Sequence, residues 1–304
     1  MSHEPVLYQE IIHALKPISN GLYVDGTLGA GGHAVGILQA SAPKGRLLGL
    51  DLDPMALELA RNKLEHFRER VVIVQDSYLS LEQHLNNLGW NAVDGILFDL
   101  GLSSMQLDTP ERGFSFQQKG PLDMRFDPEF LLTAADLVNE LPEKELADII
   151  YRFGEEKYSR RIARAIVSER PLYTTQELVS LISEVVGHYK SRIHPATRTF
   201  QALRIAVNRE LESIEAVLPI ALRALKLGGR LAVISFHSLE DRIVKQFFRR
   251  ESKDCICPSE LPICVCDHQA QLREISRRPI RPGEREIERN PRARSARLRV
   301  VQKL

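Results

Sequence analysis

The chain has 304 residues, of which 43% are hydrophobic and 27% are charged. These values are ordinary for a globular protein and exclude a disordered or fibrous chain, and the length suffices for one large domain or two ordinary ones. No stretch approaches the ~18 apolar residues of a membrane span, and the residues from Met1 to Pro5 lack the basic start of a signal peptide. The sequence therefore predicts a cytoplasmic protein without membrane contact.

The formal net charge is only +1, but the basic residues are unevenly distributed. Ten arginines lie between Arg273 and Arg299, where only four glutamates oppose them. A second basic cluster contains Lys157, Arg160, Arg161 and Arg164. Each cluster is either a solvated surface or a set of phosphate contacts, and the charges alone do not separate these readings.

The first hundred residues alternate short apolar strands with helical segments. Strands are expected at 22–25, 47–51, 71–75 and 95–99, and helices at 32–40, 54–67 and 81–88. This alternation is typical of a doubly wound α/β fold with a parallel sheet.

After Asp99 the alternation stops, and the next strand is expected only at 230–235. The intervening region predicts a loop at 102–130, helices at 134–141, 143–153, 158–169 and 175–186, and a long helix at 199–227 that ends at two glycines. A helix at 239–250, an irregular segment at 255–291 and an edge strand at 296–301 follow. We expect a sheet domain formed by 1–104 and 201–304, interrupted by an inserted helical subdomain at 105–200.

The segment 25–32, DGTLGAGG, predicts a turn from a strand through a glycine loop into a helix. Glycines let the backbone approach a nucleotide-like ligand, and Asp51 at the end of the next strand suits ribose hydroxyls. A nicotinamide dinucleotide and S-adenosylmethionine both fit these features. Asp25 favours S-adenosylmethionine, because a carboxylate there attracts a sulfonium cation and repels a pyrophosphate. The alternative is that Asp25 only caps the turn.

Several long motifs carry a resemblance to a known family. They are DLGLSSMQLD at 99–108, RGFSF at 112–116, LDMR at 122–125, HPATRTFQALR at 194–204, ISFHSLEDR at 234–242 and NPRARS at 290–295. In this order they resemble the bacterial 16S rRNA cytosine-N4 methyltransferase family, and the similarity extends from residue 3 to about residue 300.

The resemblance implies a Rossmann-like class I methyltransferase sheet with an all-helical, substrate-recognising insertion. It implies S-adenosyl-L-methionine as cofactor and, as partner, 16S rRNA within the small ribosomal subunit, methylated on a cytosine of the decoding region. The family's cofactor contacts carry over to Gly31, Gly32, His33, Asp51, Tyr78, Asp99 and Gln106. Tyr78 stands where many members have Phe, and Met105 where many have Pro, which leaves the loop path near Gln106 open.

In methyl transfer to a cytosine amine, the nucleophile is the amine nitrogen. This nitrogen is weakly reactive because its lone pair is delocalised into the ring. Acceptors for the two amine hydrogens assist because they match the transition state better than the ground state. Asp99 is the first candidate for this catalytic role. His237, Glu240 and Asp241 are second candidates, and their alternative role is to cap a helix or to oppose its dipole.

Substrate RNA contacts are expected from Arg112, Phe114, Arg125, Arg198 and Arg204. The arginines either bind phosphate or hold loops by pairing with carboxylates. Phe114 and Phe116 either stack on an unstacked base or belong to the core of the insertion. The basic C-terminal segment would add phosphate contacts that do not depend on base sequence.

The four cysteines form two C-x-C pairs, Cys255 with Cys257 and Cys264 with Cys266. Four thiolates at this spacing are able to bind a structural zinc ion, and reduced surface thiols or a disulfide are the alternatives.

Two further readings of the whole chain compete with the methyltransferase. One is an NAD-dependent oxidoreductase and the other is a non-catalytic RNA-binding assembly factor. A small-molecule methyltransferase is disfavoured by the arginine clusters. A monomer and a homodimer are equally compatible with the sequence.

Overall fold

The computed structural model describes residues 5–187, 194–258, 261 and 263–304. The residues from Met1 to Glu4, which entered the signal-peptide prediction, lie outside this set. The chain divides into two compact units, one made of Met1–Gly101 with Leu211–Leu304 and the other of Leu102–Glu210. Among the described residues, every helix is too short or too polar to cross a bilayer.

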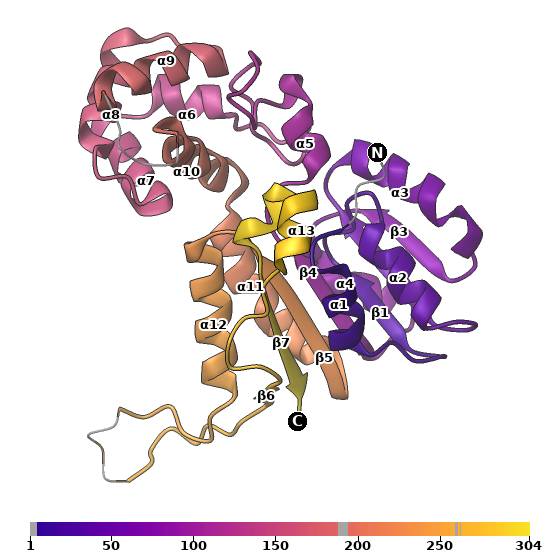
Figure 1. The fold of residues 1–304 in the computed structure, drawn as a ribbon. Helices are drawn as coiled ribbons and strands as arrows, with labels where there is room; N and C mark the ends of the chain where they lie inside the picture. The colour runs from indigo at the N-terminus through magenta and orange to yellow at the C-terminus, as the bar shows by residue number, and fades with distance from the viewer. Residues whose placement is uncertain (1–4, 188–193, 259–260, 262) are drawn as a thin grey trace. The chain divides into compact units, whose positions relative to one another are not determined.

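The first unit is built on a sheet whose seven described strands lie in the order β3-β2-β1-β4-β5-β7-β6 (Figure 1). The strands are β1 Leu22–Asp25, β2 Arg46–Asp51, β3 Val71–Gln75, β4 Val93–Asp99, β5 Leu225–Ser235, β6 Leu272–Glu274 and β7 Arg297–Lys303. The strands β1 to β5 pair in parallel, whereas β7 is antiparallel to β5 and to β6. The predicted α/β fold class is confirmed. Chain order reverses between β1 and β4, and in such sheets a ligand binds at this point, beyond the carboxyl ends of the strands.

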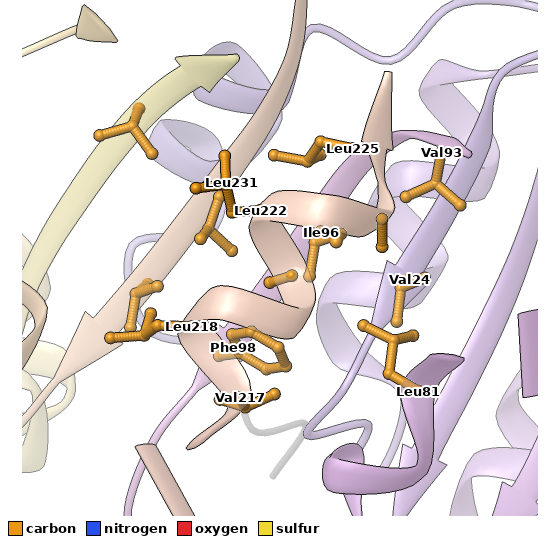
Figure 2. Packing of buried hydrophobic residues seen from close by; sticks show 14 of the residues in the cluster. Val24, Leu81, Val93, Ile96, Phe98, Val217, Leu218, Leu222, Leu225 and Leu231 are labelled. Carbon is orange, nitrogen blue, oxygen red and sulfur yellow. The ribbon is translucent and has the colours of Figure 1, made fainter. Parts of the chain in front are cut away.

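Helices cover both faces of this sheet and bury a separate apolar cluster on each. The helices of the unit are α1 Tyr8–Leu15, α2 Gly32–Ala40, α3 Pro54–Leu64, α4 Leu81–Asn87, α11 Glu210–Ala224, α12 Ser238–Glu251 and α13 Glu284–Arg289. On one face, Ile96 and Phe98 of β4 lie in one cluster with Leu218 and Leu222 of α11 (Figure 2). On the other, Ile37 of α2 is buried with residues of α1 and α3. This two-sided burial explains why the strands are apolar on both faces.

The second unit is helical and has its own core. Its helices are α5 Ser104–Asp108, α6 Ala134–Glu140, α7 Glu143–Gly154, α8 Ser159–Glu169, α9 Thr175–Val186 and α10 Ala196–Asn208. Ile150, Ile162 and Ile182, from three of these helices, are fully buried together. The helices expected at 134–141, 143–153, 158–169 and 175–186 are therefore present.

The long helix expected at 199–227 is wrong. Helix α10 ends at Asn208, Arg209 adopts a left-handed conformation with φ of 50°, and α11 begins at Glu210. The break carries no glycine or proline, whereas Pro219 lies inside α11. Because both helices are amphipathic, their apolar spacing runs on across the break and conceals it.

The ends of this region also differ from expectation. Strand β5 begins at Leu225, so Gly228, with φ of 79°, lies within β5 instead of capping a helix. Phe200 and Leu203 of α10 are buried in the core of the helical unit. That unit consequently spans Leu102–Glu210 instead of the expected 105–200.

Candidate cofactor site

The loop between β1 and α2 contains two glycines, Gly31 and Gly32, that leave little room for side chains. Gly31 precedes α2 with φ of 77°, a conformation that residues with a Cβ adopt at a cost of about 1–2 kcal/mol. A Cβ on Gly31 would lie 3.1 Å from Leu64, and one on Gly32 would lie 2.4 Å from Pro5. A side chain at either position would therefore crowd Leu64 or Pro5.

Asp51, at the end of β2, is bound to this loop. Its Oδ2 accepts a hydrogen bond from the Gly29 amide at 2.7 Å, and its Oδ1 accepts one from the Asp53 amide at 2.9 Å. Burial raises the pKa of Asp51, and these amide donors oppose the rise. Each carboxylate oxygen accepts more than one hydrogen bond, so both remain able to accept from ribose hydroxyls.

Asp25 and Asp99 end the two strands that flank the switch point. Asp25 is 1% exposed, and burial raises its pKa to about 7, with the Thr27 amide lowering it and the charge of Asp51 adding to the rise. Burial, followed by the charges of Asp25 and Glu240, raises the pKa of Asp99 well above its ordinary value. Acidic groups thus converge at an edge where a bound cation would stabilise their ionised forms.

Asp99 is fixed through its backbone and leaves one side-chain oxygen open. Its amide donates to Thr27 Oγ1 at 2.6 Å, which ties β4 to the glycine loop. Its Oδ1 is buried and has no hydrogen-bond partner among the described residues. The sequence motifs do not single out Thr27, and its hydroxyl beside the glycines is the only signal for this contact.

His33 lies 5% exposed behind the loop. Its Nε2 is 2.9 Å from the carbonyl oxygen of Val6, which only accepts, so Nε2 carries the proton. Burial lowers the pKa of His33 to about 4, against the Val6 hydrogen bond, and the ring is neutral at pH near 7. Its unprotonated Nδ1 faces Asp99 Oδ2 at 3.7 Å. The neutral imidazole therefore lies beside Asp99 without forming an ion pair with it.

Tyr78 follows β3 in the short 3-10 helix Tyr78–Ser80. Its ring lies 5.4 Å from that of Phe98, tilted by 58°. A Cβ on Gly26 would meet both Phe98, at 2.4 Å, and Tyr78, at 3.3 Å. Tyr78 thus lies beside the glycine loop, and its predicted cofactor contact remains a prediction.

Gln106 belongs to the helical unit, where it forms a capping box with Ser103. The Ser103 amide donates to Gln106 Oε1 at 3.1 Å, and the Gln106 amide donates to Ser103 Oγ at 3.1 Å. Its predicted cofactor contact remains a prediction.

His237, Glu240 and Asp241 occupy the first turn of α12 in the helix-capping and dipole positions that the sequence left as their alternative. Glu240 Oε2 accepts from the amides of Phe236, at 2.8 Å, and His237, at 3.2 Å. Asp241 binds the side chains of Arg299, at 2.6 Å, and Arg297, at 3.0 Å. Burial raises the pKa of Asp241, but the two arginines outweigh it and hold the pKa below its ordinary value. Their catalytic roles remain predictions.

The arginines predicted to bind RNA all contact protein oxygens in the helical unit. Arg112 donates to the carbonyls of Arg125 and Phe126, at 2.8 and 3.0 Å. Arg125 forms a two-pronged ion pair with Asp123, at 3.0 and 2.6 Å. These contacts hold the loop between α5 and α6.

Arg198 and Arg204 make similar contacts on α10. Arg204 pairs with Glu210 at 2.7 and 2.8 Å, and Arg198 lies 3.9 Å from Glu156. Phe114 is 6% exposed, and its ring stacks on Phe126 in the core. The burial of Phe114 favours the core role that the sequence left open, and its stacking on a base remains a prediction.

The basic segment from Arg273 to Arg299 divides into two groups. Arg297 and Arg299 pair with Asp241 at the start of α12. The remaining eight arginines are exposed: Arg273, Arg277, Arg278, Arg281, Arg285, Arg289, Arg292 and Arg294. These eight side chains form the solvent-exposed part of the basic segment.

The switch-point sheet, the glycine loop and the buried carboxyls define an α/β domain suited to a nucleoside ligand that carries positive charge. The chain matches the family model described as the MraW methylase family over residues 1–304. The chain belongs to this family.

Similar proteins named ribosomal RNA small subunit methyltransferase H include one from Dehalococcoides mccartyi, 56% identical over 302 residues, which cover 99% of this chain and 86% of that protein. One from a Geobacter species is 53% identical, and the match covers 99% of this chain and 98% of that protein. One from Thermomicrobium roseum is 51% identical, and the match covers 100% of this chain and 94% of that protein.

Proposed function

We propose that this protein transfers a methyl group from S-adenosylmethionine to small-subunit ribosomal RNA, and that the acceptor is the exocyclic N4 amine of a cytosine. The family and the names of the relatives support the RNA substrate. The observation that carries the cofactor is the set of buried carboxyls, Asp25, Asp51 and Asp99, at the ends of three strands around one glycine loop.

The cofactor supplies an electrophilic methyl group on a sulfonium sulfur and leaves as a neutral thioether. Asp51, oriented by the Gly29 and Asp53 amides, would accept hydrogen bonds from the ribose hydroxyls. The positive charge of the sulfonium favours the ionised forms of Asp25 and Asp99. A dinucleotide would instead bring a pyrophosphate toward the same carboxyls, which disfavours the oxidoreductase alternative.

Asp99 is the residue suited to the target amine. Its Oδ1 is buried without a hydrogen-bond partner among the residues described, and an amine N–H would satisfy it. As the nitrogen forms its bond to carbon, the carbon–sulfur bond breaks and the amine becomes more acidic. A carboxylate whose pKa lies above the ordinary range is a better proton acceptor, so Asp99 would hold the amine and then take its proton.

The test is tritiated methyl transfer to small subunits that lack the modification. We expect one methyl group per subunit, located on a cytosine amine when the modified base is mapped. Methylation of free RNA but not of subunits would assign the substrate to an earlier stage of assembly. Absence of transfer to either, with intact RNA binding, would favour the non-catalytic assembly factor, and binding of NAD in place of S-adenosylmethionine would favour the oxidoreductase.

A further inference from the structure

The cysteines lie in the segment between α12 and β6, which Figure 1 draws as a long loop. All four are free, and one sulfur from each lies within 4.8 Å of the other three. The two C-x-C pairs come from opposite arms of this loop and are separated by the residues from Pro258 to Ile263. Such convergence places four potential ligands around one point.

The distances between sulfurs fit a tetrahedral metal site. Cys264 Sγ lies 3.6 Å from Cys266 Sγ, which lies 3.9 Å from Cys255 Sγ. Four thiolates at the usual zinc–sulfur distance of about 2.3 Å form a tetrahedron whose edges measure about 3.8 Å. A disulfide requires two sulfurs to approach to about 2.05 Å, so these distances match metal coordination better than oxidation.

Backbone amides of the loop point at the sulfurs. The amides of Cys257, Ile256 and Val265 each lie 3.4 Å from a cysteine Sγ, those of Cys255, Cys266 and Cys257 respectively. Amide donors stabilise thiolates and orient them toward a metal, and they are the usual outer partners of such ligands. Two of these three bonds cross between the arms, so the loop backbone is shaped around the cluster.

We propose that Cys255, Cys257, Cys264 and Cys266 bind one zinc ion that holds this loop in place. Four thiolates complete a tetrahedral shell and leave no position for water, so the site is structural instead of hydrolytic. The apolar side chains beside the ligands do not form a core, since Ile256 is 43%, Ile263 75% and Val265 71% exposed. A metal therefore supplies the stabilisation that apolar burial does not provide here.

The position of the site in the fold agrees with a structural role. Helix α12 starts after the carboxyl end of β5 and returns along the sheet, so the loop that follows it lies at the opposite edge from the glycine loop. The loop is anchored there by the Gln271 amide, which donates to the Glu251 carbonyl at 2.8 Å. Zinc would fix the connection from α12 to β6 without touching the methyl-transfer site.

The experiment uses the full chain purified with a reductant and without a chelator. Metal and sulfur are quantified together by plasma mass spectrometry, and we expect one zinc per chain. Replacement of the metal by Co²⁺ should produce the intense thiolate-to-cobalt charge-transfer band of a sulfur-rich tetrahedral site. Cys257→Ser and Cys266→Ser should reduce zinc to background, whereas the matched neighbours Ile256→Ser and Val265→Ser should retain it.

The wild-type chain provides a second readout that does not depend on the folding of a variant. Removal of zinc with a chelator should make the segment between α12 and β6 sensitive to limited proteolysis, and Zn²⁺ but not Mg²⁺ should restore protection. The proposal is overturned if the chain contains no zinc after expression with added zinc, if zinc persists in the cysteine variants, or if mass spectrometry finds the cysteines paired in disulfides under reducing conditions.

Discussion

Asp99 combines a buried oxygen that has no hydrogen-bond partner within the described part of the chain with a carboxyl pKa that burial and neighbouring acids raise. Replacing Asp99 with Ala should lower kcat for methyl transfer by about 10²–10³-fold, the usual effect of losing one electrostatic partner of the transition state. The affinity for S-adenosylmethionine should change far less, because other groups bind the ribose and the glycine loop remains. Single-turnover methylation and calorimetric binding separate the two effects.

The control is Glu82→Gln, which removes an exposed carboxylate paired with Arg223 on the surface. This variant should turn over at the wild-type rate. An Asp99→Ala protein that binds cofactor normally and methylates at the wild-type rate would remove Asp99 from the mechanism.

Asp25 predicts a pH dependence of cofactor binding. With a pKa of about 7, the carboxyl is partly protonated near neutrality, and a cationic ligand must expel that proton. The affinity for S-adenosylmethionine should therefore rise as the pH increases through about 7, whereas S-adenosylhomocysteine, which lacks the sulfonium charge, should show a weaker rise. Calorimetry in buffers of different ionisation enthalpy measures the released proton.

Asp25→Asn should flatten this dependence, and equal pH profiles for the two ligands in the wild type would argue against a charge contact. In the ligand-free protein, folding stability depends on pH in the opposite direction to cofactor affinity. Because the folded state raises the pKa of Asp25, protonation of this carboxyl stabilises the fold. This contribution is complete below the ordinary pKa of an aspartate and is lost as the pH rises through about 7.

At the scale of elements, the ion pair between Asp241 and Arg299 joins α12 to β7. The two side chains are only 9% and 7% exposed, and breaking a buried pair costs about 3–5 kcal/mol because the remaining charge loses its partner. Asp241→Asn should therefore lower the melting temperature followed by circular dichroism. Methyl transfer measured well below that temperature should be retained.

Arg297→Gln is the comparison, since Arg297 contacts the same carboxylate but is 35% exposed. Its loss should cost about 1 kcal/mol or less. If Asp241→Asn melts like the wild type but no longer methylates, Asp241 has a catalytic role and the structural interpretation is wrong.

Helix prediction succeeded or failed according to whether the signals were local. Gly32–Ala40 and Thr175–Val186 have the predicted bounds, because a glycine cap or a threonine capping box marks them in sequence. The break at Arg209 has no such mark. The left-handed backbone there occurs at a residue other than glycine, and helix propensity does not reveal it.

For the whole molecule, the exposed arginines predict an RNA affinity that falls with salt. Replacing Arg277, Arg278, Arg281 and Arg285 with Gln should weaken binding and reduce the slope of log affinity against log salt by about 0.7–0.9 for each phosphate that these side chains neutralise in the wild type. Cofactor affinity should not change. Filter binding over a salt series measures the slope.

The matched comparison replaces Arg160, Arg161 and Arg164 of α8, in the helical unit, with Gln. Arg161 already donates to the Val185 carbonyl and Arg164 lies 3.5 Å from Glu143, so a smaller effect on the slope is expected. A wild-type affinity that does not respond to salt would contradict phosphate binding by either cluster.

The sequence by itself determined the alternation of strands and helices, the glycine loop and the helical insertion, because apolar spacing and turn residues act over a few positions. Only the tertiary structure decided the proton affinity of Asp25 and Asp99, the burial of Phe114 and the pairing of Asp241 with Arg299, 58 residues away. The reason is physical. Burial and charge interaction depend on distance in space, and the neighbours that set them come from strands and helices that are remote along the chain.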